Sequence, residues 1–215
     1  MARYYICNAN KTLDVSKIVF VRNEMNRPIA KYPEDFELQD FNISHSGDYV
    51  SLIIACTTFL KVGIDVMKLE KPVNIKWNEF KAPFLDMISP SELNWIESNH
   101  SVYKCGEKQD ESIFNRFYIV WVLKESVSKA IGVGLNLMSK VSFTFSLVKN
   151  RSDSSIKVLE DSYCIQFWIQ SVLDKDWYFL VDWVDQSHIF AVAINRSSCD
   201  VDKKIINCSK IFHPN

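Results

Sequence analysis

Three short segments of this chain carry side chains that could do chemistry: two carboxylates, two lysines and a histidine. They are His45 within residues 42–48, Asp65 within residues 62–68, and Lys124, Glu125 and Lys129 within residues 121–129. Such a set suits the handling of a phosphate ester with a divalent cation, because carboxylates bind a hard cation and lysines neutralise phosphate charge. Taken singly, each group also has a simpler structural explanation.

Asp65 lies between Ile64 and Val66 in an apolar run that is typical of a strand. A carboxylate buried there without a partner is costly, so it needs a cation or a lysine beside it. The alternative is an aspartate on an exposed strand face, which explains this residue at least as well when it is considered alone.

Glu125 and Lys129 are four residues apart in a predicted helix, which puts their β-carbons about 5–6 Å apart on one face. Lys124 projects about 100° away from Glu125, as 3.6 residues per turn requires. The simplest explanation of the Glu125 and Lys129 spacing is a surface salt bridge. His45 precedes Ser46-Gly47, where backbone N–H groups and hydroxyls could point at a phosphate, but a turn histidine with satisfied hydrogen bonds is the simpler explanation.

Composition excludes several classes of function. The chain has 215 residues, with 25 basic against 26 acidic residues and a formal net charge of −1, so bulk attraction to nucleic acid or to an anionic membrane is not expected. Its six cysteines are scattered without a C-x-x-C pair, which disfavours zinc and indicates free thiols in a reducing compartment. No leader or membrane-spanning run stands out, so we expect a cytoplasmic monomer.

Periodicity and turn signals predict helices that precede antiparallel strands, twice over. Helices are expected over 2–13, from a capping box at 89–92 to about 98, and over 111–131. Strands are expected over 17–22, 41–44, 49–56, 62–67, 141–148, 163–171, 177–184 and 189–194, with a polar loop at 150–155. This order suggests an α+β protein of two similar halves, with half-domains over 1–70 and 71–195 and a loosely attached tail over 196–215.

The three segments together carry a family resemblance. They read F-N-I-S-H-S-G-D-Y (41–49), V-G-I-D-V-M-K (62–68) and F-Y-x-x-W-x-x-K-E-S-x-x-K-A-I-G-x-G-L (117–135). In this order they resemble the 4′-phosphopantetheinyl transferases of the broad-specificity, surfactin-synthetase-activator type, over about residues 2–195. Asp48-Tyr49 and Met67, which stands where relatives have a glutamate, are most similar to the animal branch that modifies aminoadipate-semialdehyde dehydrogenase and fatty acid synthase.

The resemblance implies a pseudo-dimer of two α/β halves, each a helix packed on a small antiparallel sheet, with the active site in the cleft between them. It also implies transfer of the phosphopantetheine arm of coenzyme A to a serine of an apo acyl or peptidyl carrier protein, with release of 3′,5′-ADP. Mg²⁺ is the implied cofactor, held by Asp65 and Glu125, with water in the place of the missing acid at Met67.

Further roles follow from the same resemblance. Lys129 would neutralise the transferred phosphate, and Glu125 or a Mg²⁺-bound water beside it would take the serine proton. Arg22, Ser44, His45 and Lys124 would contact coenzyme A, with Ser44 and His45 near its 3′-phosphate.

The family's N-terminal part is expected to be missing here, which would weaken coenzyme binding. That expectation leaves open a non-catalytic module that binds coenzyme A or a carrier protein. A Mg²⁺-dependent phosphodiesterase using the same carboxylates is a third reading, although a hydrolase would need a further base near the metal.

Overall fold

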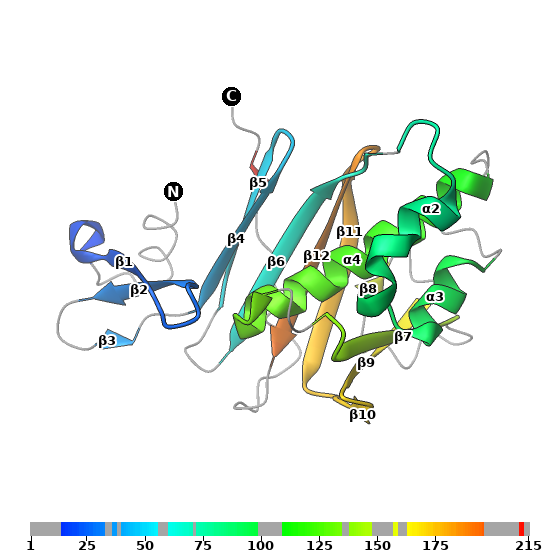
Figure 1. Ribbon diagram of the computed structural model, residues 1–215. Coiled ribbons are helices and arrows are strands. Elements are labelled where there is room, and N and C mark those ends of the chain that lie inside the picture. Colours follow the sequence, from blue (N-terminus) through cyan, green and yellow to red (C-terminus); the bar gives the residue numbers. More distant parts are fainter. Residues whose placement is uncertain are drawn as a thin grey trace.

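A computed structural model describes residues 14–32, 36–37, 40–55, 60–70, 72–98, 109–134, 138–147, 157–158, 163–195 and 211–212. The helix expected over 2–13 and the loop expected over 150–155 lie outside these residues. Figure 1 shows an elongated arrangement in which small sheets follow one another and the helices gather beside the later strands.

The strands of the described residues form four sheets, and every pairing among them but one is antiparallel. The first sheet contains β1 (Val19–Arg22), β2 (Pro28–Tyr32) and β3 (Phe36–Glu37), and the second contains β4 (Phe41–Ser46), β5 (Tyr49–Ile54) and β13 (Ile211–Phe212). The third contains β6 (Lys61–Lys68), β12 (His188–Asn195), β11 (Trp177–Asp185) and β8 (Lys157–Val158), of which β8 runs parallel to β11. The fourth contains β7 (Val141–Leu147), β9 (Tyr163–Ile169) and β10 (Val172–Leu173).

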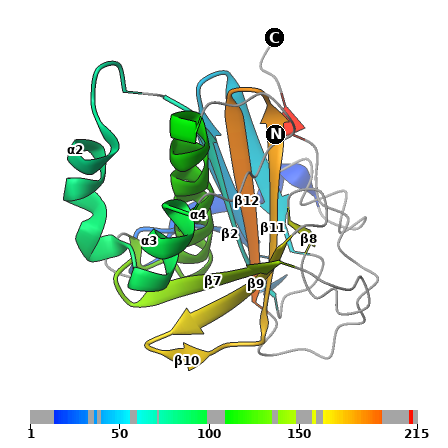
Figure 2. The same cartoon turned by 90° about the vertical axis from the view of Figure 1, so that its right-hand side faces the viewer.

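The helices cover one side of the third sheet, as Figure 2 shows. They are α2 (Trp77–Lys81), η2 (Ala82–Met87), α3 (Pro90–Ile96) and the long α4 (Gln109–Ile131), while the short η1 (Val15–Lys17) precedes β1. The predicted α+β class with small antiparallel sheets is thus confirmed. The two similar halves and the division at residue 70 stay predictions.

The long helix and the capping box were predictable from local pattern. Residues 114–130 of α4 are buried except at 121, 125 and 129, which lie one turn apart on one face, and Gly132 follows with φ 88° as the helix ends. At α3 the Ser89 hydroxyl accepts from the Glu92 N–H, and the Glu92 carboxylate accepts from the Ser89 N–H at 2.7 Å. Both features are set by neighbours within one or two turns, which is why the sequence reveals them.

Strand β6 joins the second sheet to the third. On one edge it pairs with β12 by main-chain hydrogen bonds, from Lys61 opposite Asn195 to Lys68 opposite His188. On the other edge it meets β4, whose side chains take the place of a neighbouring main chain. Every second N–H group of β6 donates to a side chain of residues 40–46. The pairs are Val62 to Asp40 (2.9 Å), Ile64 to Asn42 (2.9 Å), Val66 to Ser44 (3.3 Å) and Lys68 to Ser46 (2.9 Å).

We call these four contacts the side-chain ladder. Alternate residues of a strand point to one side, so a short polar residue at every second position of 40–46 presents four acceptors in a row. The buried N–H groups of Ile64 and Val66 and the partly buried N–H of Val62 are satisfied in this way. The polar alternation of this segment therefore serves an internal contact between two strands.

Strand β5 has a second neighbour besides β4. Ile211 and Phe212, within the segment expected to be a tail, pair antiparallel with Ser51 and Val50. The end of the described chain thus returns to the second sheet and adds a short edge strand to it, as Figure 1 shows. None of the helices within the described residues is long and apolar enough to span a membrane.

Candidate active site

Asp65 is buried in the middle of β6, with 5% of its surface exposed. Its Oδ1 lies 2.6 Å from Lys129 Nζ and accepts from the Ser44 hydroxyl at 2.8 Å. The sequence predicts that a buried Asp65 needs either a cation or a lysine beside it. The structure supplies the lysine. Three segments far apart in the sequence meet at this one oxygen atom.

Gly63 explains how closely α4 approaches Asp65. The two residues are two positions apart on β6, so they face the same side, toward the helix. A β-carbon at Gly63 would overlap the carbonyl oxygen of Ser126 and lie 2.6 Å from the backbone nitrogen of Ala130. Only glycine lets the helix backbone lie this near the strand, and the helix brings Lys129 with it.

The Ser44 hydroxyl has its hydrogen-bonding capacity filled. It donates to Asp65, accepts from Lys129 Nζ at 2.8 Å, and accepts from the Val66 N–H at 3.3 Å in the side-chain ladder. A hydroxyl offers one donor and two acceptor positions. The hydroxyl thus contacts both Asp65 and Lys129 and orients them, and its role toward coenzyme A stays a prediction.

Glu125 lies half-buried on α4, one turn before Lys129. Burial and the nearby Asp65 charge raise its pKa, and Lys129 partly opposes this shift. Among the described residues, Glu125 has no ion pair within 4.0 Å, because Lys129 is turned toward Asp65. The surface salt bridge suggested by the four-residue spacing is therefore not formed, and Glu125 remains a carboxylate that a cation or a proton would stabilise.

Asp65 and Glu125 fit the needs of Mg²⁺. The two carboxylates are close enough for one charge to raise the pKa of the other, which is the situation that a bound cation relieves. Within the described part of the chain no group of three or more His, Cys, Asp or Glu side chains could hold a metal. A two-carboxylate set suits Mg²⁺, which leaves its other positions to phosphate oxygens and water.

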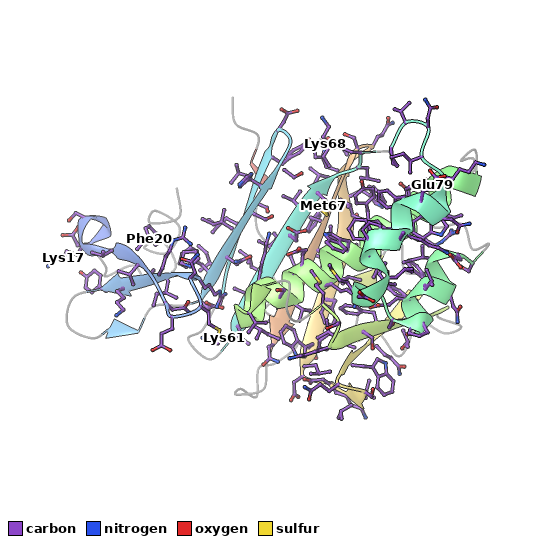
Figure 3. The ribbon with its side chains drawn as sticks, viewed as in Figure 1. Lys17, Phe20, Lys61, Met67, Lys68 and Glu79 are labelled. Carbon is purple, nitrogen blue, oxygen red and sulfur yellow. The ribbon has the colours of Figure 1, made fainter. Side chains whose placement is uncertain are left out.

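Met67 takes no part in such a site. It lies on β6 between the labelled Lys61 and Lys68 in Figure 3, partly buried against the main apolar cluster. A thioether is a soft ligand that Mg²⁺ does not favour. Of the residues Asp65, Met67 and Glu125, only the two carboxylates could therefore supply an acidic ligand.

Lys124, which the resemblance predicts to contact coenzyme A, is directed into the protein interior. Its side chain is fully buried, and Nζ lies 3.1 Å from Glu92 Oε2. It also donates to the carbonyl oxygens of Met138 (2.9 Å) and Val141 (2.5 Å). Burial lowers the pKa of Lys124 and raises that of Glu92, while their mutual attraction opposes both shifts.

His45 and Arg22 do not join the cluster around Asp65. His45 is exposed on β4, where it follows Ser44 and so projects from the opposite face of the strand. Arg22 is exposed at the end of β1, and its Nη1 donates to the Asn26 carbonyl oxygen at 2.7 Å. Their roles toward coenzyme A stay predictions.

Two contributors to the site escaped the sequence reasoning. Gly63 carried a signal, because an isolated glycine inside a strand pattern indicates close backbone approach. Glu92 was identified only as a helix cap, and nothing in its local sequence shows that it also meets α4.

Comparisons with known proteins identify the family of this chain. A family model described as the 4′-phosphopantetheinyl transferase superfamily matches residues 61–193, the span from β6 through α4 to β12. The chain belongs to the 4′-phosphopantetheinyl transferase superfamily. A second model, described as the N-terminal part of a 4′-phosphopantetheinyl transferase, matches residues 1–57. The expected loss of the family's N-terminal part is therefore not supported.

Among curated superfamily members, a phosphopantetheinyl transferase of Thraustochytrium sp. is 28% identical over 88% of this chain and 60% of its own length. The L-aminoadipate-semialdehyde dehydrogenase-phosphopantetheinyl transferase of Rattus norvegicus is 33% identical over 73% of this chain and 46% of its own. A putative 4′-phosphopantetheinyl transferase of Haemophilus influenzae is 36% identical over 56% of this chain and 43% of its own. The chain thus spans about half the length of the relatives it matches.

Proposed function

We propose that this chain transfers the 4′-phosphopantetheine arm of coenzyme A to a serine of an apo acyl or peptidyl carrier protein, in the presence of Mg²⁺. The observation that carries the proposal is the meeting of Asp65, Glu125 and Lys129 across β6 and α4. Membership of the superfamily and the names of its relatives support the reaction class.

In this proposal the serine oxygen forms a bond to the phosphorus that carries the pantetheine arm, and the bond from that phosphorus to the leaving group breaks, releasing 3′,5′-ADP. Glu125 takes the serine proton, because it is the carboxylate beside Asp65 that no lysine of the described residues pairs with. Lys129 faces the transferred phosphate with a positive charge whose direction Ser44 and Asp65 fix.

Asp65 and Glu125 would hold Mg²⁺, which when bound neutralises charge on the pyrophosphate. The carrier is proposed from the relatives, among them the rat enzyme named for L-aminoadipate-semialdehyde dehydrogenase. A cytosolic, monomeric enzyme is part of the same proposal and rests on the unpaired cysteine pattern and the near-neutral charge of the sequence.

The experiment incubates the chain with an apo carrier protein, coenzyme A and Mg²⁺, and weighs the carrier by intact mass spectrometry. We expect a gain of one phosphopantetheine group, lost on removal of Mg²⁺ and in Glu125→Gln. Glu97→Gln is the matched control, because Glu97 pairs with Lys81 on an exposed surface away from the cluster. Coenzyme A binding without mass gain would indicate a binding module, and coenzyme breakdown without a carrier would indicate a phosphodiesterase.

A further inference from the structure

Lys124 uses its whole ammonium group inside the protein. An ammonium has three N–H donors. Three oxygen atoms lie in reach: Glu92 Oε2 at 3.1 Å, the Met138 carbonyl at 2.9 Å and the Val141 carbonyl at 2.5 Å. With the side chain fully buried, no donor is left for a ligand.

Glu92 is equally engaged and is also fully buried. Its Oε2 accepts from the Ser89 N–H at 2.7 Å in addition to facing Lys124, and its Oε1 accepts from the Phe143 N–H at 3.0 Å. One carboxylate therefore ties the start of α3 and strand β7 to the middle of α4. Each of these contacts is a hydrogen bond or ion pair with a preferred direction, unlike an apolar contact.

Helix α4 is thereby held from two directions. On the β6 side its backbone rests on Gly63, and on the β7 side it is anchored by Lys124. Around the helix axis, Lys124 is about 100° from Glu125 and about 140° from Lys129. A rotation of α4 that moved Lys124 off its three oxygens would carry both residues away from Asp65.

Stability alone does not account for this pair. Burying two charges costs desolvation free energy, and apolar residues of the same volume often stabilise a core as well or better. The pair supplies a fixed orientation, because each of its hydrogen bonds has a preferred direction. The residues whose orientation it fixes lie on the same helix, Glu125 next to Lys124 and Lys129 five residues further on.

We propose that Lys124 is a positioning residue that, with Glu92, sets the rotation of α4 so that Glu125 and Lys129 face Asp65, and that it does not touch coenzyme A. The inference rests on the proposed function, which assigns Glu125 and Lys129 to the reaction. It gives the first lysine of K-E-S-x-x-K a different task from the second.

The first test leaves the sequence unchanged. The native chain is treated with an amine-acetylating reagent, with and without acetyl coenzyme A, whose thiol is already blocked, and labelled lysines are mapped by peptide mass. We expect Lys140, which is exposed, to label in both samples, Lys129 to label less when the coenzyme is bound, and Lys124 to stay unlabelled in both. Labelling of Lys124 in the free protein, with protection by the coenzyme, would overturn the proposal.

The second test separates positioning from binding. In Lys124→Met we expect kcat for carrier modification to fall about 10-fold or more, since small misplacements of reacting groups are costly, while the Kd for coenzyme A stays within about twofold. Glu92→Gln should destabilise the fold, and Glu92→Gln/Lys124→Met should recover stability because no unpaired charge remains. A raised Kd with unchanged kcat would contradict positioning.

The outcomes distinguish this inference from the proposed function. If the native chain modifies no carrier, the proposed function fails, but the labelling and the coenzyme Kd still decide where Lys124 lies. If Lys124→Met does not fold, the labelling of the native chain decides alone.

Discussion

The ammonium of Lys129 lies 2.6 Å from Oδ1 of Asp65, and this ion pair joins α4 to β6. The Ser44 hydroxyl contacts both groups at 2.8 Å. A metal ion that binds Asp65 must therefore share this oxygen with a lysine or bind the other oxygen. The same side chain that would neutralise phosphate charge also competes with the proposed cofactor.

Replacing Lys129 with methionine tests this competition. We expect Mg²⁺ to raise the unfolding temperature of Lys129→Met more than that of the native chain, because the carboxylates then lack their ammonium. In the absence of Mg²⁺ the variant should lose about 1–3 kcal/mol in the free energy of unfolding, less than for a fully buried pair because the Lys129 side chain is 29% exposed. Carrier modification should fall strongly.

The matched control is Lys61→Met, which removes an exposed lysine from β6, the strand that carries Asp65. It should leave both the Mg²⁺ effect and carrier modification near the native values. Equal Mg²⁺ stabilisation of the native chain and Lys129→Met would mean that Lys129 and the metal do not compete.

Gly63→Ala tests the close approach of strand and helix. The added β-carbon would overlap the Ser126 carbonyl, which is backbone and cannot turn aside, so α4 must move. We expect a loss of about 3 kcal/mol in urea unfolding, at the upper end for overpacking. Mg²⁺ stabilisation should weaken too, because the shift separates Glu125 from Asp65.

Gly134→Ala is the comparison for this prediction. Its β-carbon would meet nothing within 4 Å, and its φ of 65° alone imposes strain. A loss of roughly 1 kcal/mol is expected there from the left-handed backbone, without any change in the Mg²⁺ effect. If both alanine variants behaved alike, crowding at Gly63 would not be the cause.

The elements that the sequence predicts well are those fixed by near neighbours. Helix α4 and the capping box at Ser89 depend on contacts within a few residues, so periodicity and cap chemistry reveal them. Asp65 was also tractable, because the cost of burying a lone carboxylate demands a partner whatever the fold is. Joint order of motifs then identified the family.

The burial and internal partners of Lys124 could not be predicted from near neighbours. Its partners lie on α3 and at the start of β7, and no local pattern shows that Glu92 has an oxygen directed at it. The side-chain ladder was missed for a related reason. Alternating polar residues on a strand usually indicate a solvated face, whereas Asn42 and Ser44 are buried against β6.

Asn42→Ala tests the ladder. The Asn42 amide oxygen accepts from the Ile64 N–H at 2.9 Å in a buried setting, so its loss leaves a donor unsatisfied. We expect the free energy of unfolding to fall by about 1–3 kcal/mol and hydrogen exchange at the Ile64 amide to become faster. Ser46→Ala, at the more exposed end of the ladder, should cost less and quicken exchange only at Lys68. Unchanged exchange at Ile64 would show that the ladder does not hold β6.

Asp185 closes the hairpin between β11 and β12 and collects several hydrogen bonds. It accepts from the Tyr49 hydroxyl at 2.9 Å and from the Ser187 N–H at 2.7 Å, and lies 3.0 Å from His188 Nδ1. Burial acts to raise the pKa of Asp185, but these hydrogen bonds outweigh it and hold the pKa well below its ordinary value.

The low pKa of Asp185 predicts a loss of stability in acid. An unfolded aspartate takes up its proton at about pH 3.9, whereas folded Asp185 stays ionised to lower pH. The unfolded chain then binds more protons, so the stabilisation is present above about pH 4 and declines as the pH falls. The difference in unfolding free energy between the native chain and Asp185→Asn should therefore shrink from about pH 5 to about pH 3 in guanidinium titrations. A difference that stays constant over this range would mean that Asp185 titrates alike in both states, and Asp182→Asn on the same strand serves as the control.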